Sequence, residues 1–220
     1  MATYLGLINK VMVELREPVV TDITGEFARL VGQKVNQAKR DVEAATQWSY
    51  LRTEIDFVTV VGQQDYTMTG TNARSILAKD PSGRAQVFNI TTSVMGRLRE
   101  MPREYHRADI AWNLASNSVP SLFSLRRTPT TITLSLYPKP DAVYSMRAVF
   151  YIPQVELSAT SDVISVPEEP VYLLAAAYVA AERGDGSGTM AQELAAAGQK
   201  ALIEAINFDR EAAELTAFEA

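Results

Sequence analysis

The spacing of hydrophobic residues changes from a helical to a strand-like period between Asn36 and Met68. On the helical side, apolar residues recur every three or four positions and so share one face of a helix. These residues are Val35, Ala38, Val42 and Ala45. From Thr53 to Val61, apolar and polar residues alternate, as on a strand with one buried side. This stretch therefore predicts a helical layer that passes directly into a sheet.

The helical period predicts four helices in the whole chain, over residues 3–17, 25–47, 171–183 and 189–207. Thr3 and Thr24 are candidate N-caps of the first two helices. Pro18 is expected to end the first helix, because the residue before a proline disfavours helical dihedral angles. The helix over 171–183 is apolar nearly all round, so we expect it to be the buried member of a bundle.

The residues between these helix pairs carry the signals of short strands separated by turns. The expected strands cover residues 53–61, 65–69, 74–78, 84–91, 122–127, 130–136 and 142–152. Gly62-Gln63-Gln64 suggests a hairpin between the first two strands, and the strands 122–127 and 130–136 are expected to face each other across Thr128-Pro129. Short strands at this spacing predict an antiparallel sheet folded as a sandwich or small barrel. Residues 94–115 give no clear pattern.

We therefore predict an α+β fold, in which the N- and C-terminal helices form a four-helix bundle with an inserted antiparallel β-rich domain. The expected bundle contains residues 1–52 and 168–208, and the inserted β-domain covers 53–152. Residues 153–167 are predicted to be a linker, and 209–220 a C-terminal tail.

The composition argues against several kinds of chemistry. The chain has 220 residues, no cysteine and a single histidine, His106, so it cannot build disulfides, thiolate metal sites or a multi-histidine zinc site. The carboxylate pairs Glu54/Asp56 and Glu168/Glu169 are expected to be solvated or to lie at a positive helix terminus. Gly184–Gly188 follows a helix and lacks the Lys-Ser/Thr ending of a nucleotide-binding loop. We expect no catalytic site, no metal, no cofactor and no membrane span. A hydrolase or lyase whose site the sequence does not reveal is one alternative hypothesis.

One basic cluster lies in the region without clear secondary structure, and a second lies at the end of a predicted strand. The first contains Arg97, Arg99, Arg103 and Arg107 together with Tyr105, and the second contains Arg126 and Arg127. Basic residues interleaved with aromatic residues can bind nucleic acid. Arginine and tyrosine are also enriched at protein interfaces. Because the formal net charge is −5, we favour a protein interface.

Several stretches resemble the head-to-tail adaptor, or connector, proteins of tailed bacteriophages. They are the opening LINKVMVELRE, the helix EFARLVGQKVNQAKRDVEAATQWSYLR that follows a short loop, and the strand that runs into Leu136-Tyr-Pro-Lys-Pro140. The Val166-Pro167 link into an alanine-rich helix ending at Glu182-Arg183 is similar as well. The resemblance covers most of the chain and leaves out residues 94–115.

The resemblance implies a structural virion protein and not an enzyme. It implies a homo-oligomeric ring, a dodecamer, that lies below the portal protein, joins it to a tail tube or nozzle protein and lets phage DNA pass through its lumen. The protein would occupy the host cytoplasm during assembly and then the head–tail interface of the virion. Portal contacts are expected from Phe208, Leu215 and Phe218, and contacts with a neighbouring subunit or the tail from the arginine clusters with Tyr105. The alternative is a nucleic-acid-binding module that uses the Arg97–Arg107 cluster.

Overall fold

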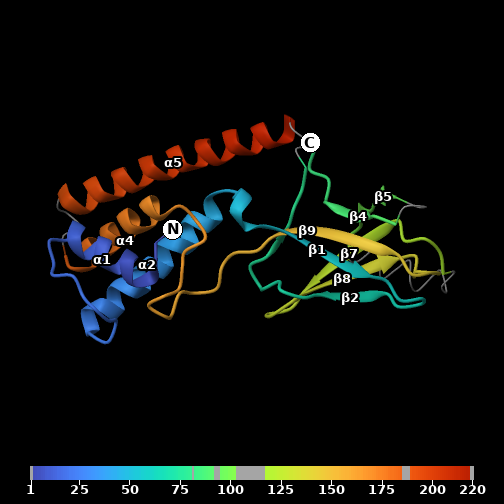
Figure 1. The fold of residues 1–220 in the computed structure, drawn as a ribbon, viewed down its shortest axis with the longest axis horizontal. Coiled ribbons are helices and arrows are strands. Elements are labelled where there is room, and N and C mark those ends of the chain that lie inside the picture. The colour runs from blue at the N-terminus through green and yellow to red at the C-terminus, as the bar shows by residue number, and fades with distance from the viewer. Residues whose placement is uncertain (1, 81, 92–94, 103–116, 185–188, 219–220) are drawn as a thin grey trace. The chain divides into compact units, whose positions relative to one another are not determined.

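The computed structural model describes residues 2–80, 82–91, 95–102, 117–184 and 189–218, with only the backbone of 213–218. The fold is mixed α+β, as the sequence predicted (Figure 1). Met1–Leu51 and Gln154–Ala220 form one compact unit, called here the helical unit. Arg52–Pro153 form the other, the β unit. His106 and residues 185–188 of the glycine-rich loop lie outside the described residues.

The described part of the helical unit contains four α-helices. They are α1 (Tyr4–Glu14), α2 (Glu26–Ala45), α4 (Glu168–Glu182) and α5 (Thr189–Phe218), with a short 3-10 helix η1 at Ser49–Leu51. Thr3 caps α1 as predicted, because its hydroxyl oxygen accepts a hydrogen bond from the Gly6 N–H at 3.2 Å. Thr24 does not cap α2. Its hydroxyl donates instead to Asp22, and Gly25 occupies the N-cap without a side-chain hydrogen bond.

Helix α4 lies at the centre of the helical unit, where its uniformly apolar sequence predicted a buried helix. It packs against α1, α2 and α5, and its buried residues include Leu174, Ala176 and Val179. Helix α5 approaches α4 closely at Gly198, where an added Cβ atom would lie 2.9 Å from Cγ of Leu174. The described helices therefore surround α4, while the four-helix bundle itself stays a prediction.

Helix α5 is longer than the sequence analysis expected. The predicted helix ended at Asn207, but α5 runs to Phe218, so the expected tail is helical to that point. Residues 209–218 contain three alanines and neither glycine nor proline, and nothing in this composition stops a helix. The C-terminal turns of α5 extend beyond the first turn of α4 (Figure 1).

Polar residues of α2 hold the chain where it returns to the helical unit at Gln154. The buried amide of Asn36 donates to the Leu157 carbonyl and accepts from the Leu157 N–H, each at 2.9 Å. The buried Lys39 ammonium contacts Glu43 at 3.1 Å and also donates to the carbonyls of Gln154 and Val155. Buried polar side chains of α2 therefore bind the backbone of the returning segment.

The described part of the β unit forms two sheets. The first has the order β1–β9–β4–β5, with β3 also paired to β9, and the second has the order β2–β8–β7–β6. All pairs are antiparallel except β6 with β7. The strands are β1 (Arg52–Val58), β2 (Asp65–Met68), β3 (Ile76–Leu77), β4 (Val87–Asn89), β5 (Gly96–Arg97), β6 (Arg99–Glu100), β7 (Leu122–Arg127), β8 (Ile132–Tyr137) and β9 (Ser145–Tyr151).

The predicted hairpin between the first two strands is wrong, whereas the pairing of β7 with β8 is confirmed. β1 pairs with β9 and β2 pairs with β8, so the turn at Gly62 links the two sheets. Side chains from both sheets share one hydrophobic core, with Met146 and Phe150 from the first and Phe123 and Leu134 from the second. This arrangement is a two-sheet sandwich.

Candidate functional site

The structure separates the described members of the two arginine clusters. Arg97 lies in β5, where its guanidinium contacts the Asp80 carboxylate at 2.5 Å and stacks over the Phe88 ring at 5.1 Å. Asp80 also binds Arg84 at 3.0 Å. The hydrogen bond from Arg97, followed by those from Arg84, holds the pKa of Asp80 well below its usual range. Arg97 is therefore already paired within its own chain.

Arg99, Arg126 and Arg127 are exposed, but Arg99 lies apart from the other two. Arg99 in β6 is opposite Leu122, the first residue of β7, whereas Arg126 and Arg127 end that strand. Five strand residues span about 16 Å, so Arg99 and Arg127 cannot share one small site. Arg103, Tyr105 and Arg107 lie outside the described residues. The described arginines thus offer separate surface charges.

Three of the four carboxylates in the predicted pairs, Glu54, Asp56 and Glu168, are partners of basic side chains. Arg147 contacts Glu54 at 2.7 Å and Asp56 at 2.7 Å across the β1–β9 pair. The hydrogen bonds from Arg147 lower the pKa of Asp56. Glu168 contacts Lys10 at 2.6 Å. In the described part of the chain, no three His, Cys, Asp or Glu side chains gather to hold a metal ion.

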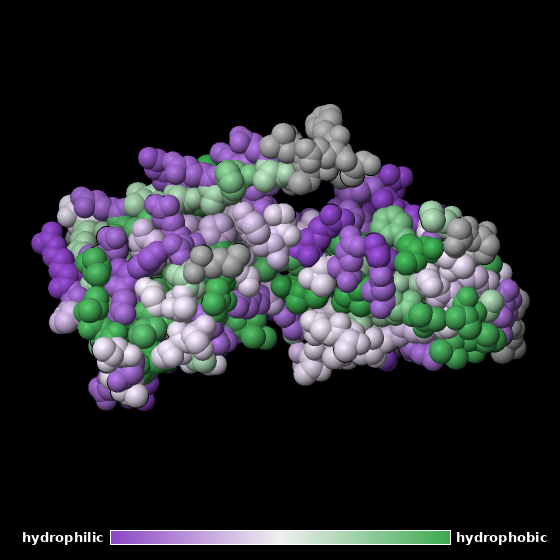
Figure 2. All heavy atoms as spheres, in the orientation of Figure 1, coloured by the Kyte–Doolittle hydropathy of each residue, from purple (hydrophilic) through white to green (hydrophobic). Residues whose placement is uncertain are grey.

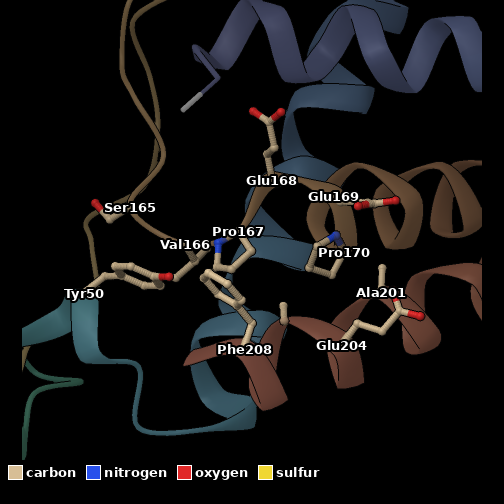
Figure 3. A pocket seen from close by; sticks show the side chains of 11 residues that line it. Tyr50, Ser165, Val166, Pro167, Glu168, Glu169, Pro170, Ala201, Glu204 and Phe208 are labelled. Carbon is tan, nitrogen blue, oxygen red and sulfur yellow. The ribbon is translucent and has the colours of Figure 1, made fainter. Parts of the chain in front are cut away.

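A pocket with a volume of about 590 Å³ lies where α4 begins and α5 passes it. We call it the α4–α5 groove. Its mainly apolar lining combines η1, the residues leading into α4, and one stripe of α5. The lining residues are Tyr50, Ser165, Val166, Pro167, Glu168, Glu169, Pro170, Ala201, Glu204, Ala205 and Phe208. Figure 3 shows the rings of Tyr50 and Phe208 next to Val166 and Pro167, with the Glu168 carboxylate directed away from them.

Two aromatic side chains of this groove are exposed to an unusual degree. Phe208 is 66% exposed and Tyr50 is 48% exposed. Ala201, Glu204, Ala205 and Phe208 recur at helical spacing, so α5 presents them along one face. A rigid aromatic side chain left in water beside an apolar pocket is typical of a surface that binds another molecule.

A buried carboxylate fixes the two aromatic residues relative to each other. Asp209, next to Phe208, accepts hydrogen bonds from the Ser49 N–H at 3.0 Å and from the Ser49 hydroxyl. Ser49 directly precedes Tyr50, and Asp209 is only 6% exposed. We call this contact the Ser49–Asp209 bridge. It joins η1 to α5 across 160 positions of sequence and holds both rings at the groove.

Of the predicted portal-binding residues, only Phe208 can be located as a side chain. Leu215 and Phe218 belong to α5 by their backbone, and their side chains lie outside the described residues. Tyr50 could not be predicted as a site residue, because the other residues of the groove lie more than a hundred positions away in the sequence. The signal for the groove in the sequence was the apolar Val166-Pro167 link, together with alanines at helical spacing that lead to Phe208.

A second exposed apolar surface lies at one end of the β unit. Val58, Val60, Val61 and Val143 are 54–64% exposed. The backbone links their segments, because the Thr59 N–H donates to the Tyr144 carbonyl at 2.9 Å. Figure 2 shows hydrophobic side chains gathered over the end of this unit. We call these four residues the valine patch.

No described helix is both long enough and apolar enough to cross a membrane. A comparison with curated proteins finds no match to this chain. The family model of the SU10 adaptor protein matches residues 2–217, which is nearly the whole chain. Members of such a family are structural components of the virion and interact with other virion proteins. The chain therefore belongs to the SU10 adaptor protein family of phage head–tail adaptors.

Proposed function

We propose that this protein is a non-enzymatic ring subunit that lies below the portal, joins it to the tail and lets DNA pass through its centre. The observation that carries this proposal is the family match over residues 2–217. A ring of twelve is the assembly that the resemblance implies. Side-to-side contacts between identical subunits close into a ring when the rotation per subunit allows it. Such a ring needs one face of each subunit to fit a different face of the next.

The charge of the chain suits a channel for DNA. Each subunit carries a formal net charge of −5, and a ring of twelve would carry twelve times that charge. A negative lumen repels the phosphate backbone, so that DNA slides through without binding tightly.

The C-terminal part of α5 is the proposed portal contact, through Phe208, Leu215 and Phe218. Phe208 is exposed, and Leu215 follows it by two helical turns on the same helix. The Ser49–Asp209 bridge supports this role, because it fixes α5 to η1 just before the last turns of the helix. A helix that is already ordered loses less conformational entropy on binding than a flexible tail does.

The β unit is the proposed contact with the tail tube or nozzle protein and with neighbouring subunits. The exposed side chains of Arg99, Arg126 and Arg127 and the valine patch support this role. Arg97 is paired with Asp80 and so has less charge to offer a partner. Arg103, Tyr105 and Arg107 remain proposed contacts of the same kind.

Mixing the purified protein with its portal tests the ring. We expect a complex of defined rotational symmetry in electron micrographs and an earlier elution volume in size-exclusion chromatography. A protein that stays monomeric and never binds the portal would refute the proposal. Deleting residues 213–220 should weaken portal binding and leave the melting temperature unchanged, because Asp209 and the bridge are kept. Equal portal affinity of the truncated chain would remove Leu215 and Phe218 from the contact.

A further inference from the structure

The α4–α5 groove has the size and lining of a site for a few side chains of another protein. Its volume of about 590 Å³ falls in the range of about 300–1,000 Å³ that holds small ligands. A folded domain cannot enter such a space, whereas two or three side chains of a peptide can. The floor is formed by Val166, Pro167, Pro170 and two alanines, none of which can form a side-chain hydrogen bond. The groove therefore favours large apolar side chains.

The charged residues of the groove are all acidic. Glu168, Glu169 and Glu204 line it, and no lysine or arginine is among the described residues of the lining. The Glu168 carboxylate is paired with Lys10. Glu204 lies 3.8 Å from Lys200, and both side chains are mostly exposed, so this contact is weak. Glu169 and Glu204 thus leave negative charge at the edge of an apolar site, where a lysine or arginine of a partner would complement it.

The two aromatic rings are positioned before any partner arrives. The Ser49–Asp209 bridge places Tyr50 and Phe208 on segments that cannot drift apart without losing two hydrogen bonds to a buried carboxylate. Binding energy at interfaces is concentrated in aromatic anchors held in well-packed surroundings. Such preorganisation lowers the entropic cost of binding. Tyr50 and Phe208 therefore have the exposure, geometry and rigidity of binding anchors.

We propose that the α4–α5 groove binds a short segment of the portal protein that carries a large apolar side chain beside a lysine or arginine. The apolar side chain would pack between Tyr50 and Phe208, and the basic group would face Glu169 and Glu204. The choice of the portal as the source rests on the proposed function. The apolar and basic character of the segment follows from the groove alone.

Overlapping synthetic peptides that cover the portal sequence test the proposal against the full-length protein. Fluorescence polarisation should identify peptides that combine a large apolar residue with lysine or arginine. Phe208→Ser should weaken their binding by at least about tenfold, the effect of losing an aromatic anchor. Ile203→Ser is the matched control, because Ile203 is 58% exposed on the same helix and does not line the groove. Its affinity should equal that of the unaltered protein.

A charge exchange tests the acidic edge separately. Glu204→Lys should slow the association of the basic peptide and reduce its salt dependence. The same variant should bind more tightly to a peptide copy in which lysine and arginine are replaced by glutamate. If Glu204→Lys still prefers the basic peptide to its glutamate copy as strongly as the unaltered protein does, the assigned chemistry of the partner is wrong.

The outcomes separate this inference from the proposed function. If the portal binds Phe208→Ser as tightly as the unaltered chain and no peptide depends on Phe208, the inference is wrong and the adaptor function stands. If Phe208→Ser blocks self-association while portal binding persists, the groove is a contact between copies, which also overturns the inference. If the portal does not bind the unaltered chain at all, both fall together.

Discussion

Replacing Asp209 by alanine should loosen the C-terminal part of α5 without unfolding the helical unit. The Asp209 carboxylate accepts two hydrogen bonds from Ser49, one from the N–H at 3.0 Å and one from the hydroxyl. A hydrogen bond to a charged group contributes about 1.5–3 kcal/mol, so two such bonds suggest a loss of about 3–6 kcal/mol. Ser49 is exposed, however, so water replaces the carboxylate in the variant. We therefore expect a loss of about 1–2 kcal/mol, the range measured for helix caps.

Two further variants show whether the bridge is the cause. Ser49→Ala removes the hydroxyl and keeps the backbone bond, so it should cost about 1 kcal/mol. In the Asp209→Ala background the same change should cost almost nothing, which gives a coupling energy of about 1 kcal/mol. Asp209→Asn should cost less than Asp209→Ala, because its carbonyl still accepts from the Ser49 N–H while its amide donates to the hydroxyl.

Hydrogen exchange measured by mass spectrometry is the assay for this prediction. Amides of α5 around Asp209 should exchange faster in Asp209→Ala, whereas amides of α4 should keep their protection. Urea unfolding followed by circular dichroism gives the global change in stability. Two results would refute the role of the bridge. One is unchanged hydrogen exchange in α5 of Asp209→Ala, and the other is a double variant whose loss of stability equals the sum of the losses in Ser49→Ala and Asp209→Ala.

Three other predictions follow from single contacts in the helical unit. Gly198→Ala should destabilise it by about 1–3 kcal/mol in thermal melts, because the new Cβ atom would lie 2.9 Å from Cγ of Leu174 and overpack the α4–α5 contact. Lys39→Met should cost about 3–5 kcal/mol in urea unfolding, because it leaves a buried carboxylate without its ammonium partner. Burial, and then the hydrogen bond to Asp41, raises the pKa of Tyr178 from 10.0 to about 12. This contribution to stability is complete below pH 10 and lost as the pH rises through 12, so Tyr178→Phe should flatten the alkaline decline of the urea midpoint.

Local patterns predicted the elements that depend on neighbouring residues. The cap at Thr3 and the buried helix α4 could be inferred because a helix forms its contacts within a few positions. The pairing of β7 with β8 was predictable for the same reason, since a short turn joins them. The turn at Gly62 shows the limit of this reasoning. A turn reverses the chain, but it does not decide which distant strand each neighbour joins, and the residues of β1 and β2 pair with partners 64–99 positions away.

The candidate site was only partly predictable, because its residues come together from distant segments. Phe208 was expected to bind a partner, whereas Tyr50 was not among the predicted site residues. The arginines formed two clusters in the sequence, yet Arg97 pairs with Asp80 and Arg99 lies at the far end of β7 from Arg127. Charge spacing in a sequence gives no information on sheet register, and register decides which arginines meet.

At two points of the helical unit, polar side chains are buried, and at one of these points aromatic side chains are also exposed. The difference between the two points identifies the functional one. On α2, the polar side chains of Asn36 and Lys39 are buried, and each binds backbone of the returning segment. These buried polar groups find their hydrogen-bond partners within the chain itself. At the α4–α5 groove, the polar Asp209 is buried and satisfied, while Tyr50 and Phe208 stay exposed beside an apolar pocket. Exposed aromatic rings that the fold holds in place gain apolar contacts only when another molecule covers them, so the groove is where a partner should be sought first.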